Sequence, residues 1–145
     1  MSLKKILTIV FLFATMFLVA CYSEEVRELT RVDFQKLNKE GNYEEVVMIT
    51  DNETIDLLKK TIENIKWEDK GVNMARNPDV KATFFYTDDN KPDRLMELGI
   101  WFDENAGTGI IGSIDEYHSR GELNKNNTNT LKNIFLHYHE NSNRN

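Results

Sequence analysis

The sequence predicts an α+β domain, in which an antiparallel sheet of about five strands is packed by two amphipathic helices, behind an N-terminal export signal. Short segments of alternating apolar and polar residues, separated by turn residues, predict the sheet. Two stretches with apolar residues at helical spacing predict the helices. We expect a signal peptide at 1–20, a lipid-modified cysteine and short linker at 21–29, a single domain at 30–140 and a disordered tail at 141–145.

The N-terminus has the pattern of a bacterial lipoprotein signal peptide. Residues 6–20 form a continuous apolar run behind Lys4 and Lys5, and the run is somewhat short of the ~20 residues that a spanning helix needs. It ends in Leu18-Val19-Ala20-Cys21, which resembles a lipobox. Cys21 is the only cysteine, so it can form no internal disulfide. We therefore expect lipid chains such as palmitate on Cys21 and an anchor on the extracytoplasmic face of the cell membrane, with a spanning helix as the weaker alternative.

The charge of the chain excludes some partners. Without Lys4 and Lys5, 16 basic and 24 acidic residues remain, a formal charge of −8. Such a domain is repelled by nucleic acid and by anionic lipid. We expect no nucleic-acid partner, and we expect membrane attachment through the covalent anchor alone.

The first half of the domain reads as a hairpin followed by a helix. Two extended segments, 30–37 and 43–50, flank a glycine-containing turn. Thr50 and Glu53 fit a capping box, which predicts a helix start at Thr50. The helix of about thirteen residues that follows has one apolar stripe, formed by Ile55, Leu58, Ile62 and Ile65.

The second half reads as three strands and a helix. After a loop around Gly71, alternation predicts strands at 80–87, 95–102 and 110–117. Helical spacing resumes at 128–140. The apolar stripe of this last helix is Leu131, Ile134, Phe135 and Tyr138.

Strand alternation also predicts a second apolar face. Val80 to Tyr86 and Met96 to Phe102 each place alternate residues toward the helices. Phe85 and Trp101 then lie on the opposite face, and Ile111 and Tyr117 join them if the third strand pairs in the same sense. Either a helix covers these aromatic residues, or they form an exposed patch that binds a partner or a small molecule. They are our candidate binding face.

Gly107, Gly109 and Gly112 match the G-x-G-x-x-G pattern of dinucleotide-binding turns. That chemistry requires a helix directly after the glycines, with its N-terminus at the phosphates. The residues that follow show no helical stripe. We therefore interpret the glycines as part of a turn and a strand and expect no cofactor.

The polar residues near position 115 allow a hydrolase hypothesis. Ser113 and Asp115 would point to one face of a strand and His118 to the other, which separates them without a bulge. A metal site from Glu116 and His118 would need His137 or His139, which diverge by about 200° on a helix. We expect no metal, and solvated polar residues are the simpler interpretation of this segment.

Four short segments, in this order and spacing, resemble the YhfM-like small lipoproteins of Gram-positive bacteria, over roughly residues 30–136. The segments are Ile49-Thr50-Asp51, Gly71-Val72-x-Met74, Asn77-Pro78-Asp79 and Ile100-Trp101. The resemblance implies an exported, lipid-anchored protein and supplies no catalytic residues. The expected function is a membrane-anchored binding or interaction module of unknown ligand; the alternative is a small extracytoplasmic hydrolase that uses residues Asp115 to Ser119.

Overall fold

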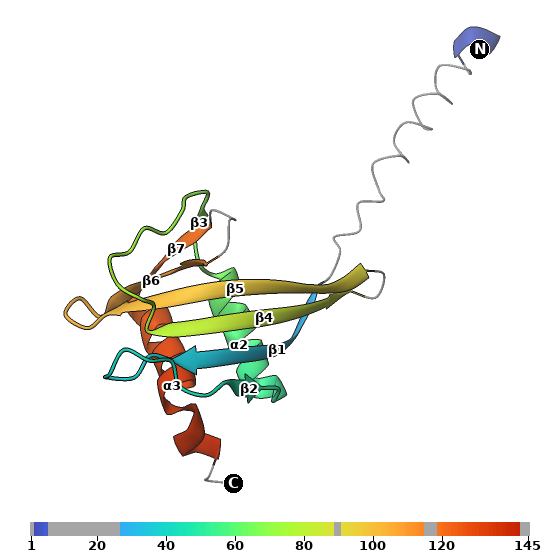
Figure 1. Ribbon diagram of the computed structural model, residues 1–145. Coiled ribbons are helices and arrows are strands. Elements are labelled where there is room, and N and C mark those ends of the chain that lie inside the picture. Colours follow the sequence, from blue (N-terminus) through green and yellow to red (C-terminus); the bar gives the residue numbers. More distant parts are fainter. Residues whose placement is uncertain (1, 6–26, 89–90, 115–118, 143–145) are drawn as a thin grey trace.

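The structure is a computed structural model that describes residues 2–5, 27–88, 91–114 and 119–142. It confirms the α+β class: one antiparallel sheet lies in front of helices α2 and α3 in the view of Figure 1. The strands are β1 Glu28–Lys36, β2 Val47–Ile49, β3 Trp67–Glu68, β4 Val80–Asp88, β5 Lys91–Asp103, β6 Thr108–Ser113 and β7 Arg120–Leu123. The helices are α2 Asn52–Glu63 and α3 Lys125–Ser142. The order across the sheet is β2-β1-β4-β5-β6-β7-β3.

In the described residues the sheet has seven strands rather than the expected five. The first hairpin, β4 and β5 form, but β2 keeps only Val47–Ile49 of the predicted 43–50, and β5 begins at Lys91 rather than at 95. Of the strand predicted at 110–117, the structure describes β6 up to Ser113, and 115–118 lie outside the described residues. The backbone N–H of Ser113 donates to the carbonyl oxygen of Ser119, and β7 then pairs with β6. β3 and β7 have only two and four residues, too few for alternation to predict them.

Both predicted helices form, with their starts displaced. Asp51, not Thr50, caps α2, because its carboxylate accepts a hydrogen bond from the backbone N–H of Thr54. α3 starts three residues before the predicted position because Asn124 caps it through the N–H of Asn127. It also continues two residues into the segment expected as a tail.

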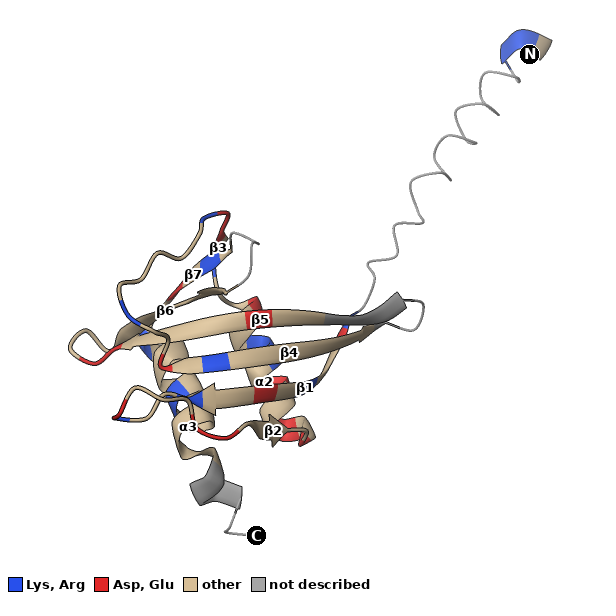
Figure 2. Ribbon diagram, viewed as in Figure 1, with Lys and Arg blue, Asp and Glu red and all other residues tan. Residues whose placement is uncertain are grey.

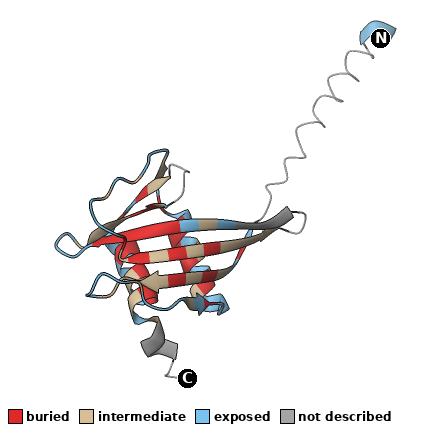
Figure 3. Ribbon diagram, in the orientation of Figure 1, coloured by how far each residue is buried: buried red, intermediate tan, exposed pale blue. Residues whose placement is uncertain are grey.

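The hydrophobic core lies between the sheet and the two helices. The predicted stripes face it, and Figure 3 shows buried residues along the middle of β1, β4 and β5. Phe34 of β1 meets Phe135 of α3 edge to face at 5.0 Å between ring centroids. Among the described residues no helix is long and apolar enough to cross a membrane, and the run at 6–20 lies outside them.

Candidate functional site

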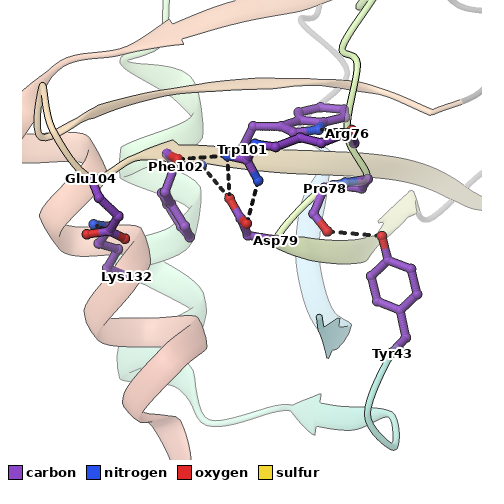
Figure 4. Close-up of polar contacts among 8 residues, drawn as sticks. All are labelled: Tyr43, Arg76, Pro78, Asp79, Trp101, Phe102, Glu104 and Lys132. Atoms are coloured by element: carbon purple, nitrogen blue, oxygen red, sulfur yellow. Dashed lines mark hydrogen bonds and ion pairs between the residues drawn. The ribbon is translucent and has the colours of Figure 1, made fainter. Parts of the chain in front are cut away.

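The sheet face away from the helices is crossed by the loop 69–79, here called the cover loop (Figure 1). Asp79, at its end, holds this loop to β5. The Asp79 carboxylate accepts two hydrogen bonds from the Arg76 guanidinium, at 2.6 and 3.0 Å, and one from the backbone N–H of Phe102, at 2.7 Å. Arg76 also donates to the carbonyl oxygen of Phe102 (Figure 4). Hydrogen bonding to Asp79 raises the pKa of Arg76, so the guanidinium stays charged.

Trp101 is the side chain that the cover loop buries. Its indole N–H donates to the carbonyl oxygen of Arg76 at 2.9 Å, and the residue is 7% exposed. The indole lies across Gly99, where a Cβ would come within 2.6 Å of the ring. Pro78 packs beside it. Trp101 is therefore buried by the cover loop, and the indole has room to lie on the sheet because Gly99, two residues earlier on β5, has no side chain. No described helix covers it.

The segments that carry the family resemblance meet in this region. Val72 packs onto Gly112 and leaves no room for a Cβ there. Asp79 of Asn77-Pro78-Asp79 accepts the N–H of Phe102, directly after Ile100-Trp101, and Trp101 donates to Arg76, directly before Asn77. Asp51 belongs to a further segment and serves as the helix cap. The resemblance thus rests mainly on residues that hold the cover loop on the sheet.

A cleft of about 770 Å³ opens beside the cover loop, at the end of the sheet where β5 turns into β6. This volume is within the range of about 300–1,000 Å³ that is usual for small-molecule sites. The lining side chains from the sheet include Trp101, Ile110, Arg120 and Glu122, and those from the cover loop are Met74 and Arg76. The β5–β6 turn adds Asp103, Glu104, Asn105 and Thr108.

The cleft has a mixed polar and apolar lining, and ion pairs join several of its charged side chains. Arg120 lies 3.3 Å from Glu122 and 3.7 Å from Glu68, measured between side-chain nitrogen and oxygen. Glu104 pairs with Lys132 of α3 at 2.8 Å. Lys70 and Arg120 together lower the pKa of Glu68. Such a lining offers donors and acceptors to a polar ligand.

The described lining contains no serine, cysteine or histidine. The hydroxyl group in the described lining is that of Thr108. The lining carboxyl groups that the structure describes are those of Asp103, Glu104 and Glu122.

A second, smaller hollow of about 280 Å³ lies on the same face of the sheet, beyond the cover loop. Asp33, Lys81 and Glu97 line its polar surface. Large exposed apolar side chains lie in and around it: Val46, Met48, Leu95 and Ile114. The part of this sheet face that the cover loop leaves open therefore carries both charged and large apolar side chains.

The structure does not bring the candidate binding face together. Phe85 lies opposite Leu95 and under the Arg31 guanidinium at 3.9 Å, whereas Trp101 is six residues farther along β5, about 20 Å away. Tyr117 lies outside the described residues. Ile111 was expected on this face but is buried in the core, because β6 pairs it with Ile100.

The other predicted site residues lie apart from the cleft or outside the description. Cys21 and residues 115–118 belong to the segments that the structure leaves out. The flanking Ser113 and Ser119 do not line the cleft, although Ser119 directly precedes Arg120, which does. Among the described residues no group of three or more acidic, histidine or cysteine side chains could hold a metal ion.

The glycine motif is part of a turn and a strand, as interpreted from the sequence. Gly107 has a φ of +68° in the β5–β6 turn, and Gly109 and Gly112 lie in β6, whose next element is β7. The next described element after these glycines is thus a strand and not a helix, so the motif lacks the strand–turn–helix order of a dinucleotide site. Sequence reasoning missed Arg76, because only Asn77-Pro78-Asp79 was conspicuous in that loop. It also missed Ile110 and Glu122, whose place at the cleft depends on the pairing of β5, β6 and β7.

The fold and cleft define a class: a small α+β domain whose sheet has helices on one face and a loop with a cleft of mixed polarity beside it on the other. The family model of the YhfM protein matches residues 28–141, and the chain belongs to that family, as the resemblance implied. No curated protein matches the sequence. A solved structure, a thioesterase-like protein from Clostridium sporogenes, is 26% identical with a TM-score of 0.53. The match covers 77% of this chain and 98% of that one.

Proposed function

We propose that the protein is a bacterial lipoprotein, anchored through Cys21 on the extracytoplasmic side of the cell membrane, that binds a small molecule with polar and apolar groups in the cleft. The observation that carries the binding proposal is the cleft of about 770 Å³, one wall of which is held by the contacts of Asp79 and Trp101. Because this wall is ordered before binding, the free energy of binding is not reduced by the cost of ordering the wall. Phe85 and Trp101 do not form one surface, so the cleft, which Trp101 lines and Phe85 does not, becomes the candidate site.

The anchor proposal is supported by the lipobox-like Leu18 to Cys21 and by the absence of a second cysteine. Cys21→Ala should abolish labelling by a fatty-acid analogue in cells and stop processing before position 21. Lys4→Ala is the matched change within the signal sequence and should leave labelling intact. Labelling that survives Cys21→Ala would show that the anchor is elsewhere.

The binding proposal is tested by photo-crosslinking in native membranes. A photoreactive residue in place of Asn105, at the lip of the cleft, should yield a defined adduct. The same residue in place of Asp56, exposed on α2, is the control and should not yield it. Ile110→Arg, which fills the cleft, should abolish the Asn105 adduct. Identical adducts from both positions, or none from Asn105, would contradict a ligand in the cleft.

A hydrolase remains the second candidate because the similar solved structure is a thioesterase-like protein. On this alternative the mature chain should hydrolyse short acyl thioesters, as the name of the similar protein suggests. The reaction would use the Asp115 to Ser119 segment. His118→Ala and Ser119→Ala should then abolish turnover, whereas Thr108→Ala in the cleft should not. Turnover that is unaffected by all three changes would exclude this segment.

A further inference from the structure

Each of the five charged side chains in the described lining of the cleft lies near a charge of opposite sign. Figure 2 shows acidic residues in the β5–β6 turn and a basic residue on β7. The ion pairs are Arg76 with Asp79, Arg120 with Glu122 and Glu68, Glu68 with Lys70, and Glu104 with Lys132. Hydrogen bonding to Asp79 and, to a smaller extent, the charge of Asp103 raise the pKa of Arg76, so Asp103 also lies near a cation. Four basic and five acidic side chains thus nearly balance around the cleft.

A ligand with a net charge gains little in such a cleft. An ion loses water when it binds, and only an opposite charge that is free to pair with it compensates that cost. The guanidinium groups of Arg76 and Arg120 are already bound to carboxylates. The carboxylate of Glu104 is bound to the Lys132 ammonium (Figure 4). The lining therefore favours a ligand without net charge.

Three lining carboxylates still have acceptor capacity for a ligand. In each of them one oxygen is bonded, and the other accepts no hydrogen bond from the residues that the structure describes. The bonded oxygens are Oδ1 of Asp103, which accepts two N–H groups of its own turn, Oε1 of Glu104, which accepts from Lys132, and Oε1 of Glu122, which accepts from Arg120. A carboxylate oxygen can only accept, so the matching groups of a ligand are donors, either hydroxyl or N–H.

Apolar side chains lie between these acceptors. Ile110 of β6 is paired with Trp101 of β5 on one side and with Glu122 of β7 on the other. Two strand spacings, about 10 Å, separate β5 from β7. Met74 of the cover loop adds a second apolar side chain to the lining. A ligand that reaches from the β5–β6 turn to Glu122 therefore places C–H groups against the middle of the cleft and donors at both of its edges.

We infer that the ligand of the cleft is a neutral saccharide. Its hydroxyl groups donate to the free oxygens of Asp103, Glu104 and Glu122. The C–H groups of its rings pack on Ile110 and Met74. A neutral peptide has one backbone N–H donor per residue and so fills fewer of these acceptors. This inference rests on the proposed ligand cleft and adds the chemical class of its ligand.

A charge series of trisaccharides of similar size tests the inference. Maltotriose and triacetylchitotriose are neutral, chitotriose in mildly acidic buffer is a cation, and trigalacturonate is an anion. The protein is the isotope-labelled mature chain, residues 21–145, which contains all the described strands, α2 and α3. In amide NMR spectra we expect both neutral trisaccharides to shift the signals of Asn105, Thr108 and Glu122. The signal of Asp56, exposed on α2, is the control and should not move.

The charged trisaccharides should leave the cleft signals in place at the same concentration and ionic strength. Trialanine blocked at both ends, which is neutral but has no hydroxyl group, should also leave them in place. A charged probe that matches the neutral ones would overturn the absence of net charge, and an equal effect of blocked trialanine, or no shift from either neutral trisaccharide, would overturn the saccharide. The photo-crosslink at Asn105 tests the binding function separately, so the two failures are distinguishable.

The charge balance supplies a second test. Glu122→Gln changes a side chain that is 76% exposed, leaves Arg120 paired with Glu68 alone, and should admit trigalacturonate. Arg120→Gln frees the carboxylate of Glu122 and should admit chitotriose. Lys36→Gln breaks the ion pair with Glu44, away from the cleft, and should leave the preference for neutral probes unchanged. If all three variants, shown by their amide spectra to be folded, retain that preference, the pairing of charges does not set it, and the argument fails.

Discussion

Removing the Asp79 carboxylate tests whether this residue holds the cover loop. In Asp79→Ala the N–H of Phe102, a residue that is 5% exposed, loses its acceptor. An unsatisfied buried donor costs about 1–3 kcal/mol. The ion pair with Arg76 is half exposed and adds about 0.5–1 kcal/mol. We expect Asp79→Ala to lower the free energy of unfolding by about 2–4 kcal/mol.

Two companion variants separate these contributions. Arg76→Ala removes the ion pair and the hydrogen bond to the carbonyl oxygen of Phe102 but leaves Asp79 bonded to the N–H of Phe102, so it should cost about 1–2 kcal/mol. Asp79→Asn retains an oxygen for the same N–H and should cost less than Asp79→Ala. Lys70→Ala, which breaks the exposed pair with Glu68, is the control and should stay within about 0.5 kcal/mol.

Urea unfolding of the mature chain measures these differences, with the slope m checked for constancy. In a Trp67→Phe background, Asp79→Ala should also make Trp101 more accessible to acrylamide in the folded state. If Arg76→Ala costs as much as Asp79→Ala, the buried donor is not the main contribution. If both cost less than about 0.5 kcal/mol, Asp79 does not hold the cover loop.

Two further predictions concern the helices. Ile62→Ala should cost about 2–5 kcal/mol by urea unfolding and Asp56→Ala less than about 0.5 kcal/mol, since only the first is buried; equal costs would contradict the core. Burial and a 2.8 Å hydrogen bond to Asp51 raise the pKa of Tyr138 to about 12. Between about pH 10 and 12 the unfolded chain releases this proton and the folded chain retains it, so the free energy of unfolding should fall as the pH rises through this range. Burial alone would raise the pKa of Asp51, but its hydrogen bonds with Thr54 and Tyr138 outweigh burial and lower this pKa. The stability that these bonds give is present above the ordinary carboxyl pKa and should be lost as the pH falls through the lowered pKa. Unfolding curves of the parent and Tyr138→Phe that show the same alkaline slope would refute the role of Tyr138.

The sequence by itself determined the elements that local physics specifies. Alternation at 80–87 and 95–102, the stripes of α2 and α3 and the turn at Gly41 depend on neighbours a few residues apart. The same locality explains the errors. The capping residue of α2 was displaced by one position, because Thr50 and Asp51 are both good caps and only the geometry selects Asp51.

The tertiary structure decided what depends on residues far apart in the chain. Pairing of β5 with β6 sets Trp101 opposite Ile110 and sends Ile111 into the core, and alternation within one strand contains no information about that register. The cover loop has no periodicity of its own. It is positioned by bonds from Asp79 to Phe102 and from Trp101 to Arg76, 23 and 25 residues apart, and the cleft exists because those bonds hold its wall.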